Sequence, residues 1–131
     1  MVTVIIPALN EEKALPLVLE EIPKDVVGHV IVVDNGSTDK TAQAAKESGA
    51  VVVREPRRGY GQACLTGLRH VPENTEIVVF LDADHSDYPE ELTQLIKPIQ
   101  DNKADLVLGS RVAGASGRAL FPQQRFGNWL A

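Results

Sequence analysis

This sequence of 131 residues has only one cysteine, no excess of basic residues and no long apolar run. The single cysteine, Cys64, excludes an internal disulfide framework and is compatible with a reducing compartment. The apolar run at 1–6 is too short for a signal peptide or a membrane span, and no other run reaches spanning length. We therefore expect a cytoplasmic protein.

The charge balance is acidic, with 13 lysines and arginines against 18 aspartates and glutamates and a net charge of −5. This balance argues against a broad nucleic-acid surface, so we expect no nucleic-acid partner, although a local basic patch could still grip phosphates. Hydrophobic residues make up 44% and charged residues 24% of the chain, which is typical of a globular protein. No repeat or linker is visible, and we expect a single domain over 1–131.

Short apolar runs rich in β-branched residues alternate with runs of helical periodicity, and this alternation predicts the fold. Strands are predicted at 2–6, 30–33, 51–53, 77–81 and 106–108. Helices are predicted at 15–22, 39–48, 61–71, from 89 onward and near 124–130. Pro7 is expected to close the first strand and Pro98 to end or bend the fourth helix. The core contacts expected from the third helix are Ala63, Leu65, Leu68 and Val71. The pattern predicts an α/β fold with a mostly parallel sheet covered on both faces.

Ligands of such sheets bind beyond the carboxyl ends of the strands. The predicted strand ends fall at Pro7, Asp34, Arg54, Asp82 and Gly109. We therefore expect the loops that follow these residues to form the functional site.

A pair of carboxylates follows the fourth predicted strand, 77–81, which is itself uncharged. Asp82 and Asp84 occupy alternate positions, so in extended backbone they point the same way. Two close carboxylates repel each other unless a cation lies between them, and oxygen ligands suit Mg²⁺ or Mn²⁺, which usually also hold substrate phosphates. The pair predicts a metal–phosphate site, although acidic pairs also follow buried strands in phosphoacceptor and hydrolase folds.

The loop at 34–39, Asp-Asn-Gly-Ser-Thr-Asp, offers carboxylate and amide groups suited to a base or ribose. The alternative is local: Gly36 permits a turn, and Thr38 or Asp39 caps the next helix. We favour capping for Thr38 and Asp39, and ligand binding for Asp34 and Asn35.

Basic residues follow the third and fifth predicted strands. Arg54, Arg57 and Arg58 accompany Gly59 and Gly61, a combination that suits an anion approached closely by backbone. A solvated basic loop is the alternative, because Gly-x-Gly is a weak signal. After the fifth strand, the arginine at 111 could meet the same phosphates, or form a surface salt bridge.

Five motifs together resemble a family 2 glycosyltransferase. They are Val-Ile-Ile-Pro-Ala-Leu-Asn-Glu-Glu at 4–12, Val-Asp-Asn-Gly-Ser-Thr-Asp at 33–39, Gly-Tyr-Gly-Gln-Ala at 59–63, Asp-Ala-Asp at 82–84 and Gly-Ser-Arg at 109–111. Their order and spacing match over nearly the whole chain. The branch that they resemble most is the dolichyl- or polyprenyl-phosphate sugar synthases.

This resemblance implies a GT-A fold, a Mg²⁺ or Mn²⁺ ion and inverting transfer of a sugar from a UDP- or GDP-linked donor, with a polyprenyl phosphate as a candidate acceptor. By position in the motifs, the nucleotide-sugar-binding residues are Pro7, Leu9, Glu11, Val33, Asp34, Asn35, Arg58, Asp82, Ala83 and Asp84. Asp82 and Asp84 are the expected metal ligands, and Asp84 and Arg111 the expected catalytic residues.

The chain departs from the family pattern in two ways. Many relatives have a second aspartate where this chain has Asn35, and Leu9 replaces a frequent aromatic residue that stacks on the base. No general base is apparent, and the family's longer chains continue with acceptor elements and often membrane helices. We therefore expect the fold to be truncated after the donor-binding half, with membrane association through the missing part, location at the cytoplasmic face of a membrane, and a homo-oligomer as further expectations.

Two alternatives remain beside a complete transferase. The first is a nucleotide-sugar-binding module without turnover. The second is a different doubly wound protein, a receiver-like phosphoacceptor or a dinucleotide-binding oxidoreductase. The turn at 7–12 contains no glycine, which argues against the dinucleotide fingerprint.

Overall fold

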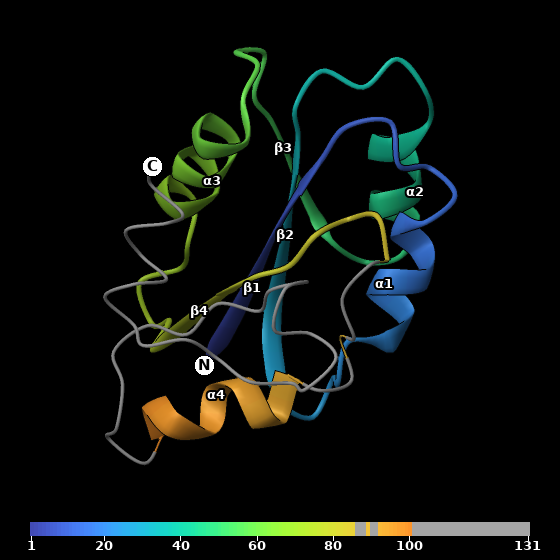
Figure 1. Cartoon of the computed structure of the whole chain (residues 1–131). Coiled ribbons are helices and arrows are strands. Elements are labelled where there is room, and N and C mark those ends of the chain that lie inside the picture. The colour runs from blue at the N-terminus through green and yellow to red at the C-terminus, as the bar shows by residue number, and fades with distance from the viewer. Residues whose placement is uncertain (86–88, 90–91, 101–131) are drawn as a thin grey trace.

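The computed structural model describes residues 1–85, 89 and 92–100, in which strands and helices alternate along the chain (Figure 1). The elements are β1 (Val2–Ala8), α1 (Leu15–Glu21), β2 (Val27–Asp34), α2 (Thr41–Glu47), β3 (Val51–Arg54), α3 (Tyr60–Arg69), β4 (Ile77–Phe80) and α4 (Leu92–Gln100). The fifth strand and last helix predicted from the sequence lie outside the described residues.

The four strands form one sheet in the order β3-β2-β1-β4, and every neighbouring pair is parallel. This arrangement confirms the predicted α/β class with a mostly parallel sheet. The central strand β1 is buried along its whole length because it has a neighbour on each side and helices over both faces. Parallel strands end at the same edge, so the loops after β1, β2 and β3 gather at the top of Figure 1.

Pro7 does not end the first strand, contrary to the prediction, because β1 continues to Ala8. The pairing of β1 with β4 stops at Ile5, whereas its pairing with β2 continues through Pro7 and Ala8. A proline can remain in a strand where its missing N–H has no neighbouring strand to bond. Within the described part of the chain, no strand pairs with β1 at Pro7 on the side of β4.

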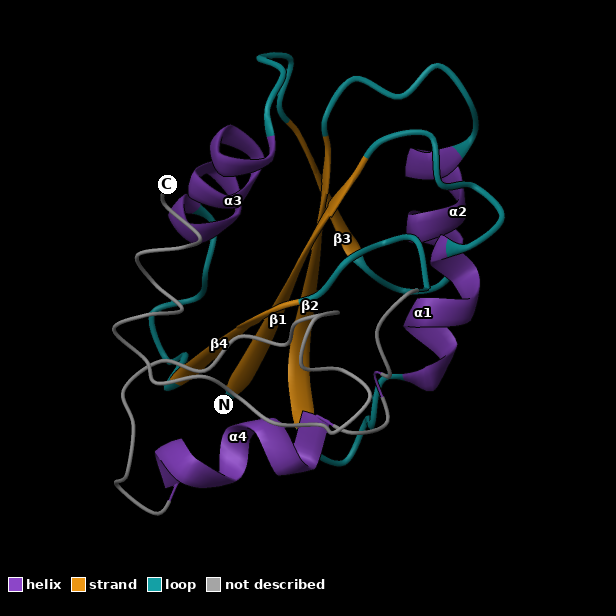
Figure 2. Cartoon of the chain, in the orientation of Figure 1, coloured by secondary structure: helices purple, strands orange, loops and turns teal. Residues whose placement is uncertain are grey.

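The sheet lies between two layers of helix, with α3 on one face and α1 and α2 on the other (Figure 2). Side chains of β1 alternate between the two: Ile5 packs with the cluster under α3, and Val4 and Ile6 join the cluster under the other helices. Leu92 and Ile96 add α4 to that second cluster. The described helices include none that is long and apolar enough to cross a membrane.

Helix α3 meets the sheet through small residues, and two of its predicted core contacts are wrong. Leu65 and Leu68 are 41% and 37% exposed, whereas Ala63 and Cys64 are fully buried. A Cβ atom on Gly67 would lie 2.5 Å from Cγ2 of Ile5, so the helix comes too close for larger side chains. The apolar spacing on this helix allowed two faces, and the close approach selects the one with small residues.

Helix α4 continues to Gln100, so Pro98 does not end it, whereas the bend that was predicted as the other outcome stays a prediction. Helix α2 is shorter than the predicted 39–48, because it begins at Thr41 and ends at Glu47. Its first residue, Thr41, donates its backbone N–H to the side chain of Asp39 in the preceding polar loop.

Candidate functional site

The loops after β1 and β2 bond directly to each other. The backbone N–H of Asn10 donates to Oγ of Ser37 over 2.9 Å, and the N–H of Thr38 donates to Oδ1 of Asn10 over 2.8 Å. One residue further on, the N–H of Glu11 donates to Oγ1 of Thr41 over 2.9 Å. Asn10 has a φ of 54°, a left-handed conformation that asparagine tolerates better than most residues. These bonds hold the two loops as one unit.

Asp39 anchors the same unit at the start of α2. Its Oδ1 accepts the backbone N–H of Thr41 over 2.9 Å, and its Oδ2 accepts the N–H of Glu12 over 3.3 Å. The hydroxyl of Thr41 also donates to Asp39, and this bond is the main cause of a lowered pKa of the Asp39 carboxyl. The capping role predicted for Asp39 is therefore present, whereas Thr38 bonds to Asn10 instead.

Asn35 ties the loop after β3 to the end of β2. Its Nδ2 donates to the carbonyl oxygens of Glu55 and Arg57 over 2.9 and 2.8 Å, and its Oδ1 accepts the N–H of Gly59 over 3.1 Å. Its own N–H donates to the carbonyl oxygen of Ala8 over 2.9 Å, and the residue is only 6% exposed. Both amide hydrogens are used within the protein, so Asn35 positions a loop.

Glu55 is a functional-loop residue that the sequence reasoning missed. Its side chain is buried, and its oxygens accept the hydroxyl of Thr66 over 2.6 Å, the N–H of Arg57 over 2.8 Å and Nε2 of Gln62 over 3.4 Å. The Thr66 hydroxyl, followed by the backbone N–H and the side chain of Arg57, lowers the pKa of the Glu55 carboxyl to about 2. The one signal in the sequence was its position, because Glu55 lies within two residues of the end of the predicted strand 51–53, as Asp82 lies next to the end of 77–81.

A cleft of about 370 Å³ opens at the carboxyl ends of β1 and β2. The end of β1, the loops after β1, β2 and β3, and the start of α3 line it, with the residues Pro7, Ala8, Leu9, Asn35, Arg58, Gly59 and Tyr60. Four of the residues predicted to bind a nucleotide sugar, Pro7, Leu9, Asn35 and Arg58, are thus brought together. Nε of Arg58 lies 3.5 Å from the point where a Cβ on Gly36 would stand, so this side chain reaches the turn after β2.

Two predicted residues at the end of β2 are buried beside this cleft. Val33 is fully buried in the cluster under α3 and is not among the lining residues. Asp34 is 7% exposed, and its Oδ1 accepts the N–H of Ser37 over 3.0 Å.

The acidic residues after β4 lie close to the loop after β1. The N–H of Leu81 donates to the carbonyl oxygen of Ile5 over 3.0 Å, so the chain stays beside β1 as it leaves the strand. Ala83 is buried and Asp84 is exposed. The pKa of Glu11 is raised by partial burial and then by the neighbouring carboxylates of Asp84 and Asp39, so these three negative groups share one region.

The described residues contain no group of three or more histidines, cysteines, aspartates or glutamates placed to hold a metal ion. Magnesium sites in phosphate-handling enzymes commonly use one or two carboxylates, with substrate phosphates completing the coordination. The predicted pair, Asp82 and Asp84, fits that kind of site. Arg111 lies outside the described residues.

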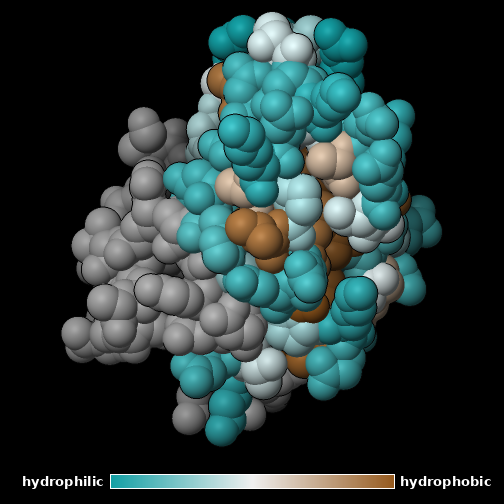
Figure 3. Space-filling view, turned by 90° about the vertical axis from the view of Figure 1, so that its right-hand side faces the viewer, coloured by the Kyte–Doolittle hydropathy of each residue, from teal (hydrophilic) through white to brown (hydrophobic). Residues whose placement is uncertain are grey.

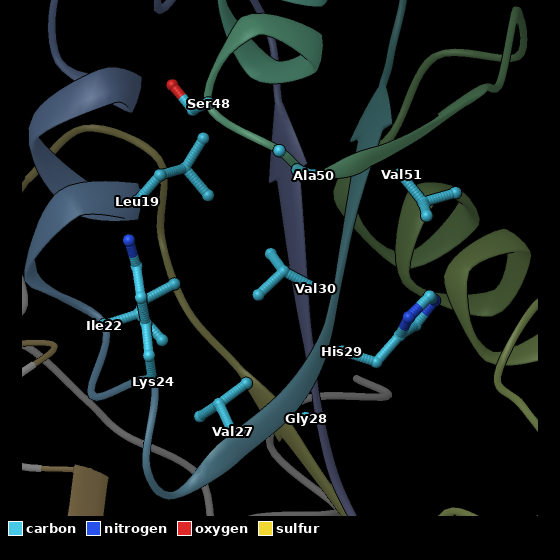
Figure 4. Close-up of a pocket in the computed structure, with 11 residues that line it drawn as sticks. Leu19, Ile22, Lys24, Val27, Gly28, His29, Val30, Ser48, Ala50 and Val51 are labelled. Atoms are coloured by element: carbon cyan, nitrogen blue, oxygen red, sulfur yellow. The ribbon is translucent and has the colours of Figure 1, made fainter.

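A second hollow, of about 210 Å³, lies at the opposite end of the sheet, where β2 and β3 begin (Figure 4). Its lining residues are Leu19, Ile22, Lys24, Val27, Gly28, His29, Val30, Ser48, Gly49, Ala50 and Val51. Figure 4 shows that Leu19, Ile22 and Val30 extend into the space between the end of α1 and β2. Figure 3 looks onto the α1 and α2 side, which is largely hydrophilic around a small hydrophobic area. Among the described residues, no carboxylate and no predicted site residue lines the second hollow.

Known proteins provide three comparisons. An uncharacterised glycosyltransferase of Mycobacterium tuberculosis is 48% identical over 115 residues, which cover 86% of this chain and 50% of the relative. The UDP-N-acetylglucosamine–dolichyl-phosphate N-acetylglucosaminyltransferase of Methanococcus voltae is 30% identical to this chain. The match covers 86% of this chain and 52% of that relative. The structure of glucosyl-3-phosphoglycerate synthase from M. tuberculosis with Mn²⁺, UDP-glucose and phosphoglyceric acid matches with a TM-score of 0.66 and 33% identity.

That structural match covers 76% of this chain and 39% of the synthase, and it confirms the GT-A fold expected from the motifs. The chain spans about half the length of the two curated relatives. The model of the family described as glycosyl transferase family 2 matches residues 3–130. The chain therefore belongs to glycosyl transferase family 2.

Proposed function

We propose that the chain is the donor-binding half of an inverting glycosyltransferase, which binds a nucleotide sugar at the carboxyl ends of β1, β2 and β4. The observation that carries the proposal is the convergence of the predicted residues. Pro7, Leu9, Asn35 and Arg58 line one cleft, and Asp84 lies near Glu11 of the loop that borders it. The synthase structure with Mn²⁺ and UDP-glucose supports a donor of this class.

Different residues of the cleft suit different parts of the donor. Pro7 and Leu9 offer apolar surface for the nucleoside, and the exposed guanidinium of Arg58 suits the diphosphate, because arginine forms bidentate bonds to phosphate oxygens. Asp34 has only one of its carboxylate oxygens bonded within the described part of the chain, so the other suits a ribose hydroxyl. Asn35 contributes by holding the loop that carries Arg58.

Asp82 and Asp84 are the proposed ligands of Mg²⁺ or Mn²⁺, with Ala83 between them packed in the core. The ion, when bound, neutralises negative charge on the departing nucleotide diphosphate. Clustered acidic groups favour this assignment, because Asp84 contributes to the raised pKa of Glu11 and a cation relieves such repulsion between carboxylates. Val33 supports the site through packing beneath it.

The acceptor is proposed to be a polyprenyl phosphate, and Arg111 to meet donor or acceptor phosphates. The dolichyl-phosphate transferase of Methanococcus voltae supports this acceptor class. An anionic phosphate needs no deprotonation before it attacks the sugar, so this acceptor class requires no general base. Such an acceptor would place the whole protein at the cytoplasmic face of a membrane.

Isothermal titration calorimetry with UDP and with GDP, each with and without Mn²⁺, tests the donor site. We expect one of the nucleotides to bind when Mn²⁺ is present, and Asp84→Asn to weaken that binding roughly tenfold or more. Glu47→Gln, which changes an exposed carboxylate on α2, is the matched control and should bind as the wild type does. Failure of both nucleotides to bind would refute the proposal, and unchanged binding by Asp84→Asn would refute the metal assignment.

The alternative is a nucleotide-sugar-binding module without turnover, which is suggested by a chain spanning about half the length of its relatives. An assay with polyprenyl phosphate and a labelled nucleotide sugar separates the two. Transfer of label to the lipid by this chain excludes the module, whereas donor binding without transfer favours it.

A further inference from the structure

The cleft contains one aromatic side chain to which the proposed function assigns no part of the donor. Tyr60 is the sole aromatic residue among the described residues that line it, and the side chain is 48% exposed. Phe80, at the end of β4, is only 5% exposed and packs in the cluster under α3. Leu9 lines the same cleft at 38% exposure but offers no aromatic ring.

The backbone directly before Tyr60 is held in place, and this fixes the position from which its side chain extends. Gly59 has a φ of 132°, a conformation that strongly favours glycine. Its N–H donates to Oδ1 of Asn35, and its carbonyl oxygen accepts the N–H of Ala63 over 3.0 Å in the first turn of α3. Tyr60 is therefore the first residue of a helix whose start is tied to the end of β2.

We propose that Tyr60 supplies the aromatic surface on which the nucleobase of the donor packs, with Leu9 as the aliphatic part of the same base site. The inference rests on the proposed function and assigns its base-contacting residue. A nucleobase is flat and aromatic, so it gains most binding energy by packing against an aromatic side chain. Such stacking accepts any base, because each base has a π-face. A residue in this position would compensate for the leucine at position 9.

The assignment predicts a contact that involves the base alone. Arg58, the neighbouring cation in the cleft, belongs to the diphosphate end. Replacement of Tyr60 should therefore weaken the binding of nucleotides and leave the binding of a ligand without a base unchanged. If Tyr60 had only a structural role, its replacement would weaken the binding of both kinds of ligand.

The test compares UDP with inorganic pyrophosphate, each titrated with Mn²⁺ into the wild type, Tyr60→Leu and Tyr60→Phe. We expect Tyr60→Leu to bind UDP about tenfold more weakly, a change within the range of base–aromatic stacking. It should bind pyrophosphate as the wild type does, and Tyr60→Phe should restore UDP binding. Leu65→Ala, at a residue 41% exposed on the same helix and outside the cleft, serves as the matched control and should leave both affinities unchanged.

Proton NMR of UDP, with Mg²⁺ as the diamagnetic ion, gives an independent readout. The uracil H5 and H6 signals should move upfield on binding to the wild type and Tyr60→Phe, and move less with Tyr60→Leu at equal saturation. Equal UDP affinity and equal uracil shifts in wild type and Tyr60→Leu would overturn the Tyr60 assignment and leave the donor site intact. A wild type that binds neither UDP nor GDP would overturn both proposals.

Discussion

The two hollows of the molecule lie at opposite ends of the same strand and differ in what surrounds them. Residues Val27 to Val30 of β2 line the second hollow, called the lower hollow below, and Asn35, just past the end of β2, lines the cleft. The cleft is bordered by loops whose side chains bond to one another, whereas most of the lining of the hollow consists of aliphatic side chains and backbone. The carboxyl end of the sheet is therefore distinguished by side chains that bond one loop to the next.

Loop-to-loop bonds explain why the carboxyl end can hold a precise arrangement without regular structure. The first two loops are joined through Asn10 and Asp39, and the second and third through Asn35. A loop that gives up its conformational freedom on folding costs no further entropy when a ligand binds. We therefore expect stability and ligand affinity to be linked at this end and independent at the other.

The largest expected effect on stability is at Asn35. Asn35→Ala removes the donor to two backbone carbonyls and the acceptor for Gly59, and should lower the free energy of unfolding by about 2–3 kcal/mol. Ser48→Ala is the matched change in the lower hollow, where an exposed hydroxyl donates to the carbonyl oxygen of Ala44. It should cost less than about 0.5 kcal/mol. Urea unfolding of both variants measures the difference, and equal losses would remove the distinction between the two ends.

A cation in each hollow gives the matched test of ligand binding. Arg58→Ala should weaken UDP or GDP binding in the presence of Mn²⁺ by about 2 kcal/mol, because a charged hydrogen bond to phosphate is lost. Lys24→Ala removes the lysine that lines the lower hollow and should leave the affinity unchanged. Calorimetry on both variants decides the matter, and a weaker Lys24→Ala complex would show that the hollow contributes to the ligand site.

Two glycines test how tightly the helices and termini pack around β1 and β2. Gly67→Ala should destabilise the protein by about 1–2 kcal/mol, because its Cβ would stand 2.5 Å from Ile5 and 3.2 Å from Val33 in the packed core. Gly28→Ala would also place a Cβ at 2.5 Å, but from Cγ of Met1, a flexible side chain at the terminus. That variant should lose less stability in thermal unfolding. A greater loss in Gly28→Ala would mean that the lower end is the more tightly packed one.

The last comparison is the pH dependence contributed by Glu55. Its pKa is lowered from 4.5 to about 2 in the folded protein, so its ionised form stabilises the fold above pH 4.5, and this contribution is lost as the pH falls toward 2. Glu55→Gln should therefore be less stable than the wild type at pH 7, by a margin that shrinks between pH 4.5 and 2. Thr66→Val, which removes the shortest bond to the carboxylate, should reduce the same pH-dependent part. A margin that stays constant across this range would contradict the lowered pKa.

The strands and their common edge could be predicted because buried parallel strands are continuous apolar runs, and polar residues directly follow them. The motif residues Leu9, Asn35 and Arg58 met at one cleft for the same reason. Bond partners could not be predicted. The roles of Asn35 and Glu55 depend on atoms from loops far apart in the sequence, and such contacts leave no periodic signal.

Helix α3 marks a second limit of the sequence. Leu65 and Leu68 have the spacing of core residues, yet Cys64 and Gly67 face the sheet. Periodicity gives the angular spacing of a helix face, but the distance between helix and sheet decides which face fits. Tyr60 was overlooked for a related reason, because its motif was interpreted through its glycines.

Paramagnetic broadening of backbone amide signals by Mn²⁺ in the presence of UDP tests most directly whether the ligand site lies at the carboxyl end. The ends of β2, Val27 and Asp34, are separated by about 23 Å at the usual rise per residue of a strand, and the broadening falls steeply with distance. The proposed site predicts strong broadening at 9–11, 34–36, 58–60 and 82–85, and narrow signals at 27–30 and 48–51. Broadening centred on 27–30 and 48–51, or none that requires UDP, would contradict a metal–nucleotide site at the carboxyl ends of the strands.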